Sequence, residues 1–337
     1  MQDQLLSLIE GRDLSAREVE AIFDDIFDGK ADPILVGGML TALQGKRPTE
    51  SEVAAAAKVM RRHVVRIDAG PGTVLDTCGT GGGPVKTFNI STAAAIVCAA
   101  SGVRVVKHGS RAATSKSGSA DVLESLGLKL DLTPDDLKRC LHETDICFAF
   151  AHQHHPAMKW VAPVRRALGV LTIFNLLGPL TNPAGSRHQL MGVTTPGRTS
   201  FMAGVLQRLG SQRAWVVCSD DGLDELATWC PATIAKLENG VIREDRFDPA
   251  ELGLTSDGPE SLRVDSPAAS AEMIQRVFNG EAGGPRDIVL LNAAAGLVVA
   301  DGADDLAQGL DVAAHAIDSG RAGETLERLV TVSRSEA

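Results

Sequence analysis

The sequence predicts an α/β fold, with a small N-terminal helical domain and a larger α/β domain built on a mostly parallel central sheet. Two observations predict it. The first 65 or so residues carry helical patterns and no strand pattern, whereas the chain from Thr73 onward alternates short β-rich runs with helices. Such alternation is typical of a parallel sheet covered on both faces. We therefore expect a helical domain at 1–68 and an α/β domain at 69–337, with helices within about 158–185 joining the helical domain.

Helix start signals support the N-terminal domain. Ser15, Ala16, Arg17 and Glu18 form a capping-box pattern followed by apolar residues at helical spacing, and residues 49–52 repeat that pattern. Between them, residues 34–43 predict a helix that is apolar nearly all round. Such a helix needs burial against a neighbour or a second subunit.

Short β-rich runs predict the strands of the larger domain. They lie at residues 74–76, 103–106, 145–150, 189–193 and 214–218. Residues 92–100 predict a helix of small side chains, and residues 288–299 fit either a buried helix or a buried strand. Residues 158–167 and 177–183 interrupt the alternation, so we assign them to the helical domain.

Composition excludes some classes of partner. The net charge is -10 and the pI about 5.3, which disfavours a nucleic-acid or anionic-membrane surface. The N-terminus lacks a signal-peptide pattern, and no apolar run reaches the ~20 residues of a membrane span. The six cysteines include no C-x-x-C pair, as expected for reduced thiols. We therefore expect a cytoplasmic protein.

A glycine-rich turn follows the first predicted strand. Four of the five residues 79–83 are glycine, which frees the backbone to direct N–H groups at an anion. Residues 89–92 (Asn-Ile-Ser-Thr) then open a helix, whose first N–H groups also favour an anion. The turn lacks the order of residues of an ATP loop and of a dinucleotide fingerprint. A glycine-rich turn alone is weak evidence, and the helix start strengthens the prediction of a phosphate site.

A basic, hydroxyl-rich loop at 107–121 follows the second strand. It carries Lys107, Arg111 and Lys116 among many small hydroxyl residues, a composition suited to a polyphosphate. A charge run of this kind is more often a solvated loop. Here both loops fall at the same edge of the predicted sheet, where α/β proteins bind ligands, so we favour a ligand site.

These motifs carry a resemblance to a known family. Asp-Thr-Cys-Gly-Thr-Gly-Gly from Asp76, Asn-Ile-Ser-Thr from Asn89 and Lys-His-Gly-x-Arg from Lys107 resemble the anthranilate phosphoribosyltransferases. The match continues through His-Pro-Ala-Met-Lys from His155, Arg165, Phe-Asn-Leu-Leu-Gly-Pro-Leu at 174–180 and Gly-Leu-Asp-Glu at 222–225, and spans roughly residues 30 to 300. The related pyrimidine nucleoside phosphorylases share the fold but lack this Lys-His-Gly-x-Arg loop.

The resemblance implies the fold of the nucleoside phosphorylase/phosphoribosyltransferase class and transfer of phosphoribosyl from phosphoribosyl pyrophosphate to anthranilate, in tryptophan biosynthesis. It also implies a homodimer formed through the helical domain. The implied contacts to phosphoribosyl pyrophosphate are Gly79, Gly82, Gly83, Thr87, Asn89, Ile90, Ser91, Thr92, Lys107, His108, Gly109, Ser110, Arg111, Ala112, Ala113, Thr114, Ser115 and Ser119. The implied contacts to anthranilate are Gly79, Ser110 and Arg165.

Asp224 and Glu225 are the candidate metal ligands. Adjacent carboxylates supply the hard oxygens that Mg²⁺ prefers, although alone such a pair is more often a solvated acidic turn. The resemblance implies that they hold one Mg²⁺ and that Ser91 meets a second, giving two ions per active site.

Arg165 and the histidines complete the candidate site. Arginine grips a planar carboxylate bidentately, and we expect Arg165 on an otherwise core-facing helix, with Arg166 a surface cation. His152, His154 and His155 lack zinc spacing, so we favour a structural or channel-lining group. We expect His155 and His108 to border the amine pocket.

Two positions depart from the family pattern. Gly83 stands where the family commonly has Asp, and Ser110 where it commonly has Asn. These departures leave open a related aminobenzoate as the acceptor, a non-catalytic phosphoribosyl pyrophosphate binder, and a nucleoside phosphorylase. Lys107, Asp224 and Glu225 favour the enzyme over the binder.

Overall fold

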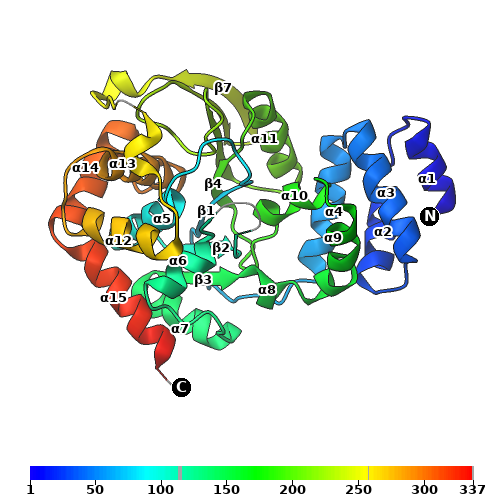
Figure 1. Cartoon of the computed structure of the whole chain (residues 1–337), viewed down its shortest axis with the longest axis horizontal. Helices are drawn as coiled ribbons and strands as arrows, with labels where there is room; N and C mark the ends of the chain where they lie inside the picture. Colours follow the sequence, from blue (N-terminus) through cyan, green and yellow to red (C-terminus); the bar gives the residue numbers. More distant parts are fainter. Residues whose placement is uncertain (113–115, 257, 336–337) are drawn as a thin grey trace.

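The structure, a computed structural model, describes residues 1–112, 116–256 and 258–335. Figure 1 shows an N-terminal group of helices beside a larger part that contains the sheet. The N-terminal helices are α1 (Gln2–Ile9), α2 (Ala16–Phe27), α3 (Pro33–Lys46) and α4 (Glu50–Arg62). Both expected capping boxes are present, Ser15 with Glu18 at α2 and Thr49 with Glu52 at α4. The fold class predicted from the sequence is confirmed.

The larger part contains a seven-stranded sheet in the order β3-β2-β1-β4-β5-β6-β7. Neighbours from β3 to β5 pair in parallel, whereas β6 and β7 are antiparallel. The strands are β1 (Leu75–Gly79), β2 (Val105–Gly109), β3 (Ile146–Phe150), β4 (His188–Gly192), β5 (Arg213–Ser219), β6 (Ala232–Glu238) and β7 (Val241–Phe247).

Helices cover both faces of this sheet. The α-helices that follow β1 are α5 (Ile90–Ala100), α6 (Ser119–Ser125), α7 (Pro134–Thr144), α8 (Ala151–His154), α9 (Ala162–Leu168), α10 (Phe174–Leu177), α11 (Thr199–Arg208), α12 (Pro267–Phe278), α13 (Gly284–Val299), α14 (Leu306–Asp318) and α15 (Arg321–Arg334). The short 3₁₀ segments are η1 (Pro156–Trp160), η2 (Gly178–Leu180), η3 (Pro196–Arg198), η4 (Pro249–Leu252) and η5 (Pro259–Leu262).

Alternating side chains of β5 divide the core into two. Trp215 and Val217 join the cluster built around α5 and α13, whereas Ala214, Val216 and Cys218 join the cluster that contains α11 and the N-terminal helices. Successive residues of a strand point to opposite faces of the sheet, so the two faces of this one sheet contribute side chains to the two core clusters. The helical part therefore packs onto the sheet largely through α11, which contacts α4 on one side and β5, β6 and β7 on the other.

The segment after β3 leaves the sheet and contacts the N-terminal helices. η1 packs on α2, α9 packs on α3, and α10 packs on α4. The chain crosses between the two parts near residues 63–70 and again near residues 181–187, where Ile67 N–H donates to the carbonyl of Pro183 over 3.2 Å. These two crossings lie side by side.

Two features of the structure differ from the sequence expectations, and a third resolves an ambiguity. The β6–β7 hairpin was not predicted, although Asn239 and Gly240, with φ of 50° and 74°, form the tight turn that such a dipeptide favours. Strand β2 starts two residues later than expected and includes Lys107 and His108, which were expected in a loop. Residues 288–299 lie in helix α13, which settles the helix-or-strand ambiguity; a side chain at Gly296 would meet Cys98 Sγ at 2.9 Å.

No helix in the described part of the chain is long and apolar enough to cross a membrane. All six cysteines lie in that part, and each is a free thiol.

Candidate functional site

The candidate site lies where the strand order reverses, at the carboxyl ends of β1 and β4. Gly79 and Gly192 are paired at the ends of these strands. A Cβ on Gly79 would overlap the Asp224 carboxylate, and a Cβ on Gly192 would overlap the Asp224 backbone. Only glycine fits at both positions, because the loop that carries Asp224 crosses directly over the strand ends. Parallel sheets bind ligands in this type of crevice.

Backbone hydrogen bonds hold the glycine turn against that loop. Thr80 N–H donates to the Gly192 carbonyl and Gly81 N–H donates to Asp224 Oδ2, both over 2.9 Å. Gly81 and Gly82 have φ of 64° and 79°, which residues with a Cβ rarely adopt. The turn therefore needs its glycines, and one of its amides serves Asp224.

Gly83 is fixed by a close approach of backbone to backbone. A Cβ at this position would lie 2.9 Å from the Gly222 carbonyl oxygen and 3.1 Å from Thr194 Cγ2. Because Gly222 belongs to the loop that carries Asp224 and Glu225, a side chain at Gly83 would displace that loop. This contact gives a physical reason for glycine where the family commonly has aspartate.

Lys107 extends from β2 to the start of α5. Its Nζ donates to the Thr77 carbonyl over 2.5 Å and to Ser91 Oγ over 3.3 Å, and the side chain is buried. Burial lowers the pKa of Lys107, and the carboxylates of Asp76 and Glu225 oppose that shift. The lysine therefore places its ammonium group between the carboxylates of Asp76 and Glu225 and the start of α5, where a phosphate is expected to bind.

Asp224 and Glu225 are half-buried side by side on the loop after β5. Burial, followed by repulsion from Asp224, raises the pKa of Glu225 to about 8, although Lys107 and hydrogen bonds with Ser91 oppose the shift. Burial likewise raises the pKa of Asp224. Two crowded carboxylates beside a serine oxygen form a donor set that fits Mg²⁺, whose charge would relieve their repulsion.

The second loop is folded tightly at Gly118 but does not present Arg111 as a free cation. A Cβ at Gly118 would overlap the backbone of residues 110–112. Arg111 is exposed and pairs with Asp121 over 2.9 Å and Glu124 over 2.7 Å, while the Ala112 N–H donates to Asp121. Ser110 and Ser119 lie together, since Ser119 Oγ donates to the Ser110 carbonyl over 3.4 Å.

Asn89 ties the two loops to a third element. Its amide donates to the Ser117 carbonyl over 3.3 Å, and its Oδ1 accepts from Ser270 Oγ of α12 over 2.7 Å. Thr87 is half-buried nearby in sequence, whereas Ile90 is buried in the core. Thr92 is also buried, and its hydroxyl has no hydrogen-bond partner among the described residues. The expected contacts Ala113, Thr114 and Ser115 lie outside the described residues.

Two histidines form a neutral pair beside the turn. His108 Nδ1–H donates to the Gly178 carbonyl over 3.2 Å, and His155 Nε2–H donates to His108 Nε2 over 3.1 Å. Burial lowers the pKa of His155 to about 4 and that of His108 well below its usual value. His154 is buried and donates to the Val65 carbonyl, and His152 is exposed. The described residues contain no metal-binding group of three or more His, Cys, Asp or Glu side chains.

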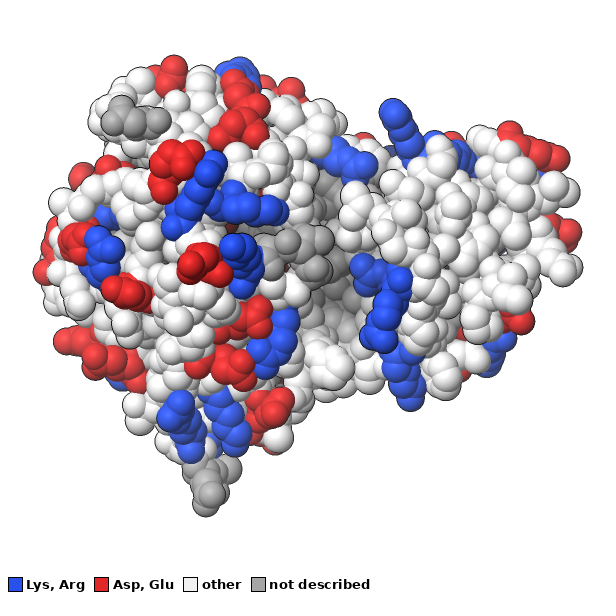
Figure 2. Space-filling model, in the orientation of Figure 1, with Lys and Arg blue, Asp and Glu red and all other residues white. Residues whose placement is uncertain are grey.

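Arg165 lies on α9, which packs on α3 of the helical part. Figure 2 shows a hollow between the helical part and the larger part of the molecule. The Arg165 guanidinium lies over the Phe174 ring at 5.4 Å, and burial lowers its pKa. Within residues 1–112, 116–256 and 258–335 the guanidinium has no carboxylate partner. α9 contains no fully buried residue, but Val164 and Leu168 are partly buried against the core of the helical part, on the side of α9 that packs near α3.

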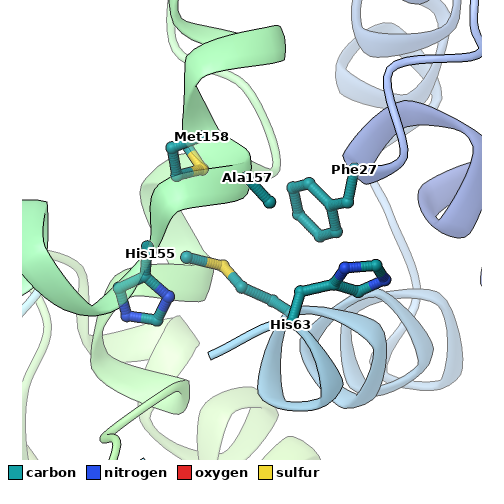
Figure 3. A pocket seen from close by; sticks show the side chains of 6 residues that line it. Phe27, His63, His155, Ala157 and Met158 are labelled. Atoms are coloured by element: carbon teal, nitrogen blue, oxygen red, sulfur yellow. The ribbon is translucent and has the colours of Figure 1, made fainter. Parts of the chain in front are cut away.

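A narrow pocket lies between His155 with η1 on one side and the helices α2 and α4 on the other. Figure 3 shows His155, Ala157 and Met158 facing Phe27 and His63 across it. The pocket reaches the histidine pair through His155, which donates to His108.

Sequence reasoning missed three residues of the site. Asp76 is fully buried and accepts from His108 N–H over 3.2 Å, and burial raises its pKa to about 6. Gln189 donates to the Pro179 carbonyl over 2.5 Å, and Gly192 lies under Asp224. The sequence offered one signal for Asp76, namely that an acidic residue stands within the first predicted strand. Gln189 and Gly192 gave none, because their role depends on strand register.

The fold and the site together define a two-domain glycosyl transferase. Residues 2–64 match the family model described as "Glycosyl transferase family, helical bundle domain", and residues 71–323 match "Glycosyl transferase family, a/b domain". More narrowly, the chain belongs to the anthranilate phosphoribosyltransferases.

Known proteins of this name support that assignment. The anthranilate phosphoribosyltransferase of Thioalkalivibrio sulfidiphilus is 45% identical over 335 residues, covering 99% of each chain. The crystal structure of the Thermus thermophilus enzyme has a TM-score of 0.92 at 38% identity, covering 98% of this chain and 99% of that one. The Saccharomyces cerevisiae enzyme, in complex with phosphoribosyl pyrophosphate and Mg, has a TM-score of 0.90 at 26% identity, covering 100% and 99%.

Proposed function

We propose that the chain transfers the phosphoribosyl group of phosphoribosyl pyrophosphate to the amine of anthranilate, releasing N-(5-phosphoribosyl)anthranilate and pyrophosphate in tryptophan biosynthesis. The observation that carries the proposal lies at the switch point of the sheet, where Asp224 meets the glycine turn and where Glu225 and Lys107 meet Ser91 at the start of α5. This arrangement suits a substrate that carries several phosphates and a metal ion.

Phosphoribosyl pyrophosphate is bound, in this proposal, by the two loops and the start of α5. The glycine turn and the first N–H groups of α5 supply backbone donors, and Ser91 and Asn89 supply side-chain oxygens. Arg111 takes part only if it exchanges Asp121 and Glu124 for a phosphate, a step that its exposed position permits. Of the other expected contacts, Ile90 and Thr92 act through the backbone, because their side chains are buried.

Asp224 and Glu225 would hold Mg²⁺, with Ser91 at a second ion, so that two ions serve each active site. Bound there, the metal would neutralise charge on the pyrophosphate as it leaves. The crowding that raises the pKa of Glu225 supports this assignment, since a divalent cation is the natural partner for two adjacent carboxylates.

The chain's own residues would align the reactants and stabilise the leaving group. The amine nitrogen forms a bond to C1 of the ribose while the bond from C1 to the pyrophosphate oxygen breaks, and the proton of the new ammonium passes to water. An aromatic amine is neutral at pH 7, so no strong base is needed. Lys107 and the loop amides would stabilise the charge that develops on the departing oxygen. Closure of the two parts would exclude water from the activated sugar.

Arg165 would orient the acceptor by gripping its carboxylate. The guanidinium is half-buried, is held over Phe174, and has no carboxylate partner in the described part of the chain. Gly79, Ser110 and the neutral pair of His108 and His155 would border the ring and its amine. Neutral histidines suit this role because they add no charge that would compete with Arg165 for the carboxylate.

We further propose a cytoplasmic homodimer that associates through the helical domain. This domain would comprise residues 1–68 together with helices within about 158–185. Several large apolar side chains of this part are exposed, among them Ile34 at 85%, Ile9 at 67% and Leu171 at 66%. A second copy would cover such a surface. The free cysteines are compatible with a reducing compartment.

The metal assignment is tested by replacing its carboxylates. Asp224→Asn and Glu225→Gln should each sharply reduce turnover and raise the Mg²⁺ concentration needed for half-maximal activity, with little change in the thermal melt. Asp220→Asn is the matched control, because Asp220 lies on the same loop but pairs with Arg246 at the surface. Equal Mg²⁺ dependence in all three variants and the wild type would remove the assignment.

A further inference from the structure

A second pocket, separate from the candidate active site, lies between two of the chain crossings that join the helical and α/β parts, those near residues 63–70 and 181–187. Its volume is about 320 Å³, and its lining includes Arg61, Arg66, Asn182, Arg187 and Gly210. Arg61 lies in the last turn of α4, Arg66 in the outgoing crossing, and Arg187 in the returning one. The pocket lies at the amino end of β4, whereas the candidate active site lies at its carboxyl end.

The three guanidinium groups are satisfied only in part, and only by backbone. Arg61 donates to the carbonyls of Leu180 over 2.6 Å and Leu209 over 3.4 Å. Arg66 donates to the Arg61 carbonyl over 3.4 Å, and Arg187 donates to the Gly210 carbonyl over 3.0 Å. Each guanidinium has five N–H donors, so most donors of the three groups remain free for a ligand.

No carboxylate neutralises the three arginines within residues 1–112, 116–256 and 258–335. Asp301 lies 3.8 Å from Nε2 of His188, the residue after Arg187, but it is paired with Arg213. This absence is selective, because the chain has 43 acidic against 33 basic residues and many of its other arginines form ion pairs. Burial and the neighbouring charge of Arg66 lower the pKa of Arg61 to about 10, as expected for cations held together without a counterion.

We propose that this pocket, defined by Arg61, Arg66 and Arg187, is a binding site for a small phosphate-type oxyanion. Planar guanidinium groups bind phosphate oxygens bidentately, and three cations favour a ligand that carries more than one negative charge. The volume suits inorganic phosphate or pyrophosphate. Because both crossings contribute an arginine, the bound anion links the outgoing and returning segments and stabilises the junction of the two parts.

The test is calorimetric titration of the full chain with inorganic phosphate and, separately, with pyrophosphate, without Mg²⁺ and at constant ionic strength. Arg66→Gln and Arg187→Gln are the pocket variants, because both side chains are exposed and make one backbone hydrogen bond each. Arg243→Gln is the matched control, since it removes the same charge from an exposed position of β7. Lys107→Gln reports on anion binding at the candidate active site.

We expect each pocket variant to weaken binding of at least one anion by roughly tenfold or more, whereas Arg243→Gln leaves it unchanged. The anion that shows the loss identifies the ligand. Without anion the pocket variants should melt no lower than the wild type, because a repelling charge has been removed; with anion the wild type should gain more stability. Equal affinities in the pocket variants and Arg243→Gln would overturn the proposal. So would a loss confined to Lys107→Gln, an outcome that leaves the proposed function intact.

Discussion

Replacing Gly83 by alanine or aspartate tests how closely the glycine turn packs on the loop that carries Asp224 and Glu225. The added Cβ would lie 2.9 Å from the Gly222 carbonyl oxygen and 3.1 Å from Thr194 Cγ2. Unstrained contacts between such atoms need roughly 3.5 Å, so backbone must move by about half an ångström. Overpacking of this kind costs about 1–3 kcal/mol.

The strain should reach the metal ligands. Gly222 lies two residues before Asp224, and Asp224 holds the turn through the Gly81 N–H. If loop displacement relieves the strain, catalytic efficiency falls about tenfold for each 1.4 kcal/mol lost from transition-state binding. Gly83→Asp should therefore lower kcat/KM, even though the family commonly has aspartate at this position.

The assay is the loss of anthranilate fluorescence with phosphoribosyl pyrophosphate over a range of Mg²⁺ concentrations, beside thermal melts. Gly197→Ala is the control, because a Cβ there meets nothing within 4 Å. Both Gly83 variants should melt lower than the control and need more Mg²⁺. A Gly83→Ala protein that matches Gly197→Ala in melt and in Mg²⁺ dependence would refute this reasoning, and an improved Gly83→Asp would show that the loops are not so close.

Two further predictions concern the acceptor and the metal. Arg165→Ala should raise the KM for anthranilate by about 30-fold, because a lost charge pair in a half-exposed site costs about 2 kcal/mol. The KM for phosphoribosyl pyrophosphate should change little. Arg166→Ala is the neighbouring control, and equal effects of Arg165→Ala on both KM values would point to a structural role. The Mg²⁺ concentration for half-maximal activity should rise roughly tenfold per pH unit as pH falls below about 8 and should level off above it, because Glu225, with its pKa raised to about 8, must lose its proton to bind metal. A pH-independent Mg²⁺ requirement between pH 6.5 and 8.5 would contradict that order of events.

Local signals in the sequence predicted much of the fold and of the site. The capping residues Ser15 and Thr49 specify helix starts through bonds within four residues, so they could be recognised without tertiary information. The glycine turn and Lys107 could be placed at one edge of a parallel sheet because each follows a strand pattern.

Features that depend on distant partners could not be predicted in this way. The pairing of Gly79 with Gly192 and the passage of Asp224 over both require the register of β1 and β4, which no local pattern encodes. The ion pairs that hold Arg111 were missed for the same reason, since composition alone does not separate a ligand contact from a paired surface cation. The β6–β7 hairpin was not predicted because most of β7 is exposed and charged and so lacks an apolar strand pattern. Its Asn-Gly dipeptide, which favours a hairpin turn, was a signal for it in the sequence.

The most direct test of the account is a single reaction of the purified chain with anthranilate, phosphoribosyl pyrophosphate and Mg²⁺, in which anthranilate fluorescence and released pyrophosphate are followed together. The account predicts that fluorescence is lost only when both phosphoribosyl pyrophosphate and Mg²⁺ are present, with one pyrophosphate released for each anthranilate consumed. Binding of phosphoribosyl pyrophosphate without any consumption of anthranilate, or release of pyrophosphate at the same rate whether or not anthranilate is present, would contradict it.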